Sequence, residues 1–210
     1  MGSIPIIHPF YFQDIFIVME NVTLTKEQLF KMMKLREQSE NKTSSNGEPK
    51  LYKLSDKVVK ILNSRIKDEY FAHALYRAAA NWCHDQNYVK AAAFFDADAK
   101  TELEHAEIIQ KYMTDFNIIP NVEGSKEKFQ FNNLLDIIHQ AYEFELYLMK
   151  QYNKNSSEVF NEDLTTFDFL QQFRKIQQDS VVEFNDLINA SNLVDKSDKF
   201  QILYFEQTYF

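Results

Sequence analysis

The apolar residues of this 210-residue chain recur at alternating steps of three and four over four long segments, the spacing of one face of an α-helix. The segments run from about Ser55 to His84, Tyr88 to Phe116, Asn132 to Asn153 and Leu164 to Ala190. At 1.5 Å per residue the longest of these helices are roughly 40 Å long, which is typical of a four-helix bundle. The pattern therefore predicts an all-α fold.

The segments between and around the helices set the expected organisation. The connection "NIIPNVEGSKEKFQF" between the second and third helices is the longest, as expected if it crosses the length of the bundle once. Residues 1–53 are predicted to be an N-terminal extension: an apolar arm "IIHPFYFQDIFIVM", a short helix and a polar linker. Residues 54–190 form the bundle, and residues 191–210 are a short aromatic C-terminal tail.

Composition and charge narrow the function classes. The chain has only 3 Gly and 4 Pro, which favours long helices, and its one cysteine, Cys83, allows no internal disulfide. The net charge is −8: residues 1–53 hold 7 Lys/Arg against 6 Asp/Glu, and residues 54–210 hold the other 16 against 25. This acidic body argues against a nucleic-acid partner and is compatible with attracting cations. The longest apolar runs are too short to span a membrane, so we expect a cytoplasmic protein with no membrane partner.

Each apolar stripe is interrupted near its middle by a residue that can ligate a metal. The interruptions are Glu69, then Glu102 with His105 one turn later, then Glu145, and finally Gln177. Carboxylates that meet in a dry core repel one another and are costly to bury, and a divalent cation relieves both problems. Oxygen ligands with one imidazole suit iron, manganese or zinc. The interruptions therefore predict a metal site inside the bundle.

The segments that carry these residues resemble the ferritin family in content and in order. "LNSRIKDEYFAHALY" is similar to its first helix, "AAAFFDADAKTELEHAEII" to its second, "AYEFELYL" to its third and "FLQQFRKIQQDSVVEF" to its fourth. The resemblance covers residues 54–190, about two-thirds of the chain. Thr101 and Ile176 stand where many members carry glutamates of an accessory third iron site, so the resemblance does not extend to that site.

The resemblance implies a di-iron centre that oxidises Fe(II) for iron storage or detoxification. Glu102 would bridge the two irons. Glu69 and His105 would complete the protein ligands of one iron, and Glu145 would hold the other. Gln177 is either a further ligand or a buried amide that bonds a ligand. Tyr76 is either a packed aromatic residue or, as the resemblance suggests, an electron donor beside the irons, so we group it with the catalytic residues.

The resemblance also implies a homo-oligomer, such as a ferritin-type shell. The aromatic arm in residues 1–53 has no counterpart in the plain ferritin pattern, and we expect it to pack on its own bundle, a neighbouring subunit or another protein. That arm supports an alternative function, in which the chain is a structural or cargo component of a larger assembly and uses the ferritin-like bundle as a module.

Overall fold

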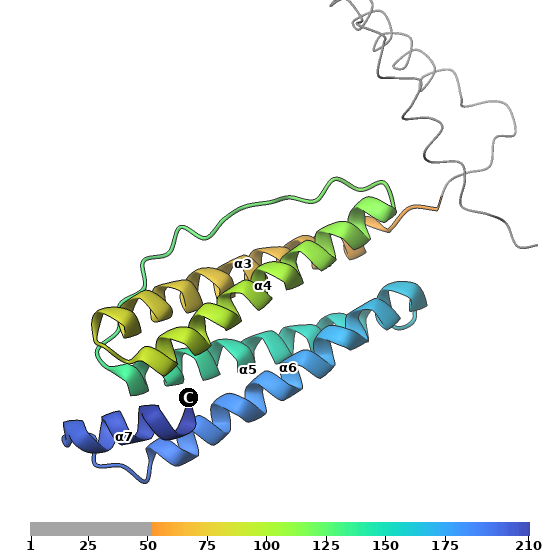
Figure 1. Ribbon diagram of the computed structural model, residues 1–210. Helices are drawn as coiled ribbons and strands as arrows, with labels where there is room; N and C mark the ends of the chain where they lie inside the picture. The colour runs from red at the N-terminus through yellow and green to blue at the C-terminus, as the bar shows by residue number, and fades with distance from the viewer. Residues whose placement is uncertain (1–51) are drawn as a thin grey trace, which may run out of the picture. The chain divides into compact units, whose positions relative to one another are not determined.

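The computed structural model describes residues 52–210, which form five helices and no strand (Figure 1). The helices are α3 (Asp56–Asp85), α4 (Val89–Asp115), α5 (Leu134–Val159), α6 (Leu164–Ser191) and α7 (Lys199–Tyr209). The predicted all-α, four-helix architecture is therefore confirmed. The predicted arm, short helix and most of the linker lie outside the described residues, so their docking role stays a prediction.

Local capping explains where three of the long helices begin. The side chains of Ser55, Asn133 and Asp163 each accept a hydrogen bond from the backbone N–H three residues later. A side-chain oxygen at this position satisfies one of the N–H groups that the first turn of a helix leaves unpaired. The predicted N-cap at Ser55 is confirmed, and it fixes the start of α3 at Asp56.

The four long helices pack as two pairs, α3 with α4 and α5 with α6, and α3 also contacts α5. The connection between α4 and α5 runs along the α3–α4 pair for the length of the bundle (Figure 1). The predicted long crossover is thereby confirmed. At one end of the bundle, Ser55 and Lys57 at the start of α3 hydrogen-bond to Glu162, just beyond α5, so α3 and α5 are antiparallel.

The buried core consists of two apolar clusters with a polar layer between them. On α3 one cluster ends at Ile66 and the other begins at Ala72; on α4 they are separated by the stretch between Ala99 and Ile109. The same division occurs on α5 and α6. Every predicted metal ligand falls in this gap: Glu69, Glu102, His105, Glu145 and Gln177. The folding of the four stripes therefore brings the polar interruptions to one level.

Helix α5 is longer than the sequence pattern indicated. We predicted an end near Asn153, but the helix continues to Val159. The polar run "NKNSSE" resembles a helix end, yet Asn155 and Ser156 are buried in the structure, as is Val159. Tertiary packing of this face therefore overrides the local polar signal.

The aromatic tail forms helix α7, which lies against α6 and α4 (Figure 1). Its Glu206 is fully buried, and Oε1 accepts hydrogen bonds from the backbone N–H groups of Lys90 at 2.7 Å and Ala91 at 3.1 Å. Within the described residues, Tyr88 at the N-cap of α4 provides no side-chain bond to that helix. Glu206 thus caps α4 from a distant part of the chain. Between residues 52 and 210, none of the helices combines the length and apolarity needed to cross a bilayer.

Candidate metal centre

Three of the predicted ligands meet at the centre of the bundle. One ligand atom from each of Glu69, Glu102 and His105 lies within 4.8 Å of the others, and all three residues are buried. His105 Nδ1 is 3.1 Å from Glu102 Oε2 and 3.7 Å from Glu69 Oε2. Glu102 and His105 share one face of α4 because they are separated by three residues, and Glu69 faces them from α3. Two carboxylates and an imidazole thus point to one place.

An unpaired oxygen shows that this group fits a cation. Among the residues that the structure describes, Glu69 Oε2 is buried and has no hydrogen-bond partner. Such a group is costly in a folded core, and buried charges are usually paired or coordinate metals. A divalent ion beside Glu69 Oε2 would satisfy it and would also accept Glu102 and His105 Nδ1 as ligands.

The pKa values of Glu102 and His105 also fit a cation site. Burial raises the pKa of Glu102 well above its usual range, although the hydrogen bond from His105 opposes the change. Burial alone lowers the pKa of His105, but the Glu102 and Glu69 carboxylates outweigh it and raise that pKa to about 10. The imidazole is therefore protonated at neutral pH, and its proton occupies the place where a cation would bind.

Glu145 lies at the same level and is held by two side chains. Tyr76 donates a hydrogen bond to Glu145 Oε1. With its amide oriented by its hydrogen-bond partners, Gln177 donates to Glu145 Oε2 at 2.8 Å. Burial raises the pKa of Glu145 to about 7, while the Tyr76 hydrogen bond opposes the shift. In this arrangement Gln177 orients Glu145, and its amide oxygen is turned away from that carboxylate.

The structure adds one residue that the sequence analysis did not single out as part of the site. Tyr152 on α5 donates a hydrogen bond to Glu69 Oε1, and both residues are fully buried. Burial and the charge of Glu69 raise the pKa of Tyr152 well above its usual range, so the phenol keeps its proton and remains a donor. The sequence did carry a signal, because Tyr152 follows Glu145 at the same seven-residue interval at which Tyr76 follows Glu69.

Other ionisable groups lie near the cluster but do not join it. Asp98 is half-buried, and burial together with the charge of Glu183 raises its pKa to about 7. His73 Nδ1 lies 2.5 Å from the carbonyl oxygen of Ala99, so this histidine is satisfied by the backbone.

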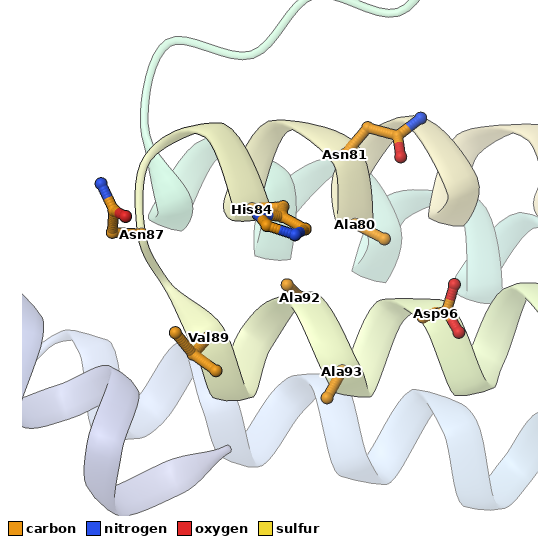
Figure 2. A pocket seen from close by; sticks show the side chains of 8 residues that line it. All are labelled: Ala80, Asn81, His84, Asn87, Val89, Ala92, Ala93 and Asp96. Carbon is orange, nitrogen blue, oxygen red and sulfur yellow. The ribbon is translucent and has the colours of Figure 1, made fainter.

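A pocket of about 370 Å³ lies elsewhere, where α3 turns into α4 (Figure 2). It is lined by Ala80, Asn81, His84, Asn87, Val89, Ala92, Ala93 and Asp96. None of the residues that meet in the polar layer lines it. Asp96, the one acid among these eight described residues, forms ion pairs with Arg77 and Lys100. The candidate centre is therefore the polar layer inside the bundle and not this surface pocket.

Comparisons with known proteins identify the fold and the family. A family model described as the ferritin-like domain matches residues 59–194. The bacterial non-heme ferritin of Campylobacter jejuni is 30% identical over 143 residues, which cover 67% of this chain and 86% of the relative. The bacterial non-heme ferritin of an Escherichia coli strain is 26% identical over 146 residues, covering 69% of this chain and 88% of the relative.

Solved structures agree on the architecture. An open-pore ferritin from Archaeoglobus fulgidus superposes with a TM-score of 0.70 at 20% identity and covers 74% of this chain and 96% of its own. The ferritin of Chlorobium tepidum gives a TM-score of 0.66 at 22% identity, covering 73% and 95%. At these identities the likeness establishes the fold alone. Taken with the family model and the sequence relatives, the matches show that this chain belongs to the ferritin family.

Proposed function

We propose that the bundle binds Fe(II) as a substrate in its polar layer and oxidises it to Fe(III), for iron storage or detoxification. The observation that carries this proposal is the buried group of Glu69, Glu102 and His105, in which one carboxylate oxygen has no hydrogen-bond partner among the described residues. Family membership supports iron as the ion, since the matched relatives are described as non-heme ferritins. Manganese and zinc share the same ligand preferences and would compete for the site.

The side chains divide into two neighbouring metal positions. Glu69 and His105 would hold one iron, Glu145 would hold the other, and Glu102 lies on α4 within the charge field of both glutamates. We therefore assign Glu102 as the bridge. The second position has fewer protein ligands and is expected to bind more weakly, with Gln177 orienting Glu145.

The chemistry balances with dioxygen as the oxidant. Two Fe(II) ions each give up one electron, and one dioxygen molecule takes both electrons and two protons from solvent to become hydrogen peroxide. Peroxide can serve in place of dioxygen, in which case the two electrons and two protons yield two water molecules. The protein contributes by holding two irons side by side and by excluding bulk water from the layer. Tyr76 would stand beside the second iron, because its hydroxyl bonds Glu145.

Aerobic Fe(II) oxidation by the purified protein, followed by near-ultraviolet absorbance, tests the proposal. The wild type should show rapid oxidation that saturates near two irons per chain, as a two-metal site requires. Glu102→Ala should lose the rapid phase. Glu104→Ala, an exposed neighbour on the same helix, is the matched control and should keep it. A wild type that oxidises iron no faster than buffer would refute the proposal.

We also propose that the chain forms a homo-oligomer, as the open-pore ferritin that it resembles suggests. Sedimentation equilibrium of the purified full chain tests this, because a monomer would give the mass of a single chain, 24.9 kDa. The alternative of a structural or cargo component rests on the N-terminal extension, which lies almost wholly outside the described residues.

A further inference from the structure

Two buried tyrosines bind two buried glutamates in a reciprocal way across the α3–α5 pair. Tyr76 on α3 donates to Glu145 on α5, and Tyr152 on α5 donates to Glu69 on α3. All four side chains are at most 1% exposed. Because the helices are antiparallel and both tyrosines follow a glutamate by seven residues, the two hydrogen bonds have the same register. The two halves of the polar layer are therefore built alike.

The bond from Tyr152 decides which oxygen of Glu69 can reach a metal. Tyr152 engages Oε1, and Oε2 is left on the side of His105, 3.7 Å from Nδ1. Within the described part of the chain this Oε2 has no hydrogen-bond partner. The phenol thus prevents the carboxylate from rotating to satisfy both oxygens elsewhere, and it presents one oxygen to the cluster.

Tyr152 is itself fixed by aromatic and cationic neighbours. Its ring stacks on Phe173 of α6, with centroids 5.2 Å apart and planes inclined by 3°. The Arg65 guanidinium lies 5.6 Å from the ring centroid and pairs with Asp68 at 2.6 Å. Phe173 also meets the His105 ring edge-on at 5.9 Å. One stack of side chains therefore supports both Glu69, through Tyr152, and His105, through Phe173.

We infer that Tyr152 is the positioning residue for the metal held by Glu69 and His105, as Tyr76 is for the metal held by Glu145. Each phenol then sets the affinity of its own position through one carboxylate, and removing one phenol weakens one position while the other is spared. This inference rests on the proposed two-metal function. It assigns to Tyr152 a role that packing alone does not require, since Phe would fill the same stack.

Anaerobic titration of the metal-free full chain with cobalt(II), followed by its visible absorption, tests the assignment. The wild type should bind two ions in two steps. Tyr152→Phe should weaken the tighter step about 10- to 100-fold, the usual effect of losing a partner that orients a ligand. Tyr76→Phe should weaken the other step by a similar factor. Tyr112→Phe is the matched control, because its hydroxyl bonds Thr166 at 3.0 Å and touches neither glutamate.

A double-mutant cycle separates positioning from a general loss of packing. If Tyr152 acts through Glu69, Tyr152→Phe should lower affinity less than twofold when Glu69 is already Ala, because no side-chain oxygen is then left for the phenol to orient. A full effect in that background, or equal weakening of both steps, would overturn the inference. Helical circular dichroism of each variant confirms folding.

The outcomes also distinguish this inference from the proposed function. A wild type that binds fewer than two cobalt ions per chain and does not oxidise iron overturns both. If the wild type binds two cobalt ions and Tyr152→Phe binds them with the same affinities, only the role of Tyr152 is overturned.

Discussion

Replacing Glu145 by Gln should stabilise the metal-free protein at alkaline pH. Glu145 is 1% exposed, and burial raises its pKa from 4.5 to about 7. A carboxyl group whose pKa is raised by folding contributes no penalty below its unfolded pKa, where it is protonated in both states. Its destabilising effect therefore develops as the pH rises from 4.5 to 7 and is complete above that value. Gln carries no charge, so its contribution does not change with pH.

The size of the effect follows from the shift in pKa. At 1.36 kcal/mol per pKa unit, the shift of Glu145 lowers the free energy of unfolding by about 3 kcal/mol at pH 8 and by about 1 kcal/mol at pH 5.5. Hydrogen bonding should survive the substitution, because Tyr76 can still donate to the amide oxygen and Gln177 can turn its own amide over. The free energy of unfolding of Glu145→Gln should therefore exceed that of the wild type by about 3 kcal/mol at pH 8.

Guanidinium unfolding in the presence of EDTA, at one protein concentration and at pH 5.5 and pH 8, measures the difference. The exposed Glu107 provides a matched control, because Glu107→Gln should change stability by less than about 0.5 kcal/mol at either pH. Equal stability of Glu145→Gln and the wild type at both pH values would show that Glu145 is not held as a buried, destabilised carboxylate.

Three further predictions concern the metal, the tail and the aromatic stack. Zinc(II) at 100 times its dissociation constant should raise the free energy of unfolding by about 2.7 kcal/mol per site at pH 7.5, and Glu102→Gln should lose most of this gain in denaturant titrations with and without EDTA. Glu206→Ala should weaken the cap on α4 by about 1 kcal/mol and speed hydrogen exchange at Lys90; unchanged exchange would contradict the cap. Phe173→Ala should lower the free energy of unfolding by about 3–5 kcal/mol in calorimetry, and it should weaken cobalt binding because Phe173 packs against His105. A loss of stability below about 1 kcal/mol would argue against the stack.

The long elements and the ligand level were predictable because they depend on local periodicity. Apolar residues spaced three and four positions apart indicate which face of a helix is buried, and a polar residue on that face must then be buried too. Four such interruptions at compatible intervals can share one level of a bundle. Glu69, Glu102, His105, Glu145 and Gln177 accordingly lie between the two apolar clusters.

What sequence reasoning missed depends on contacts between distant segments. Tyr152 lies on an apolar stripe and reads as a packed ring, since periodicity says nothing about where its hydroxyl points. Glu206 sits in an aromatic tail, and its capping role exists only because α7 folds back onto the start of α4. The end of α5 was missed for the same reason, because Asn155 and Ser156 are polar by type and buried by tertiary packing.

The metal-free centre shows why affinity for a cation and stability of the empty bundle oppose each other. Burial of Glu102 and Glu145 raises their pKa values, and the proton on His105 neutralises part of the remaining charge. A divalent ion must displace these protons, so metal binding should release protons and strengthen as the pH rises. Glu145, whose buried charge destabilises the fold at pH 8, then gains a cation as a partner. Tyr152 and Tyr76 belong to the same balance, because each holds a glutamate in the orientation that suits a cation.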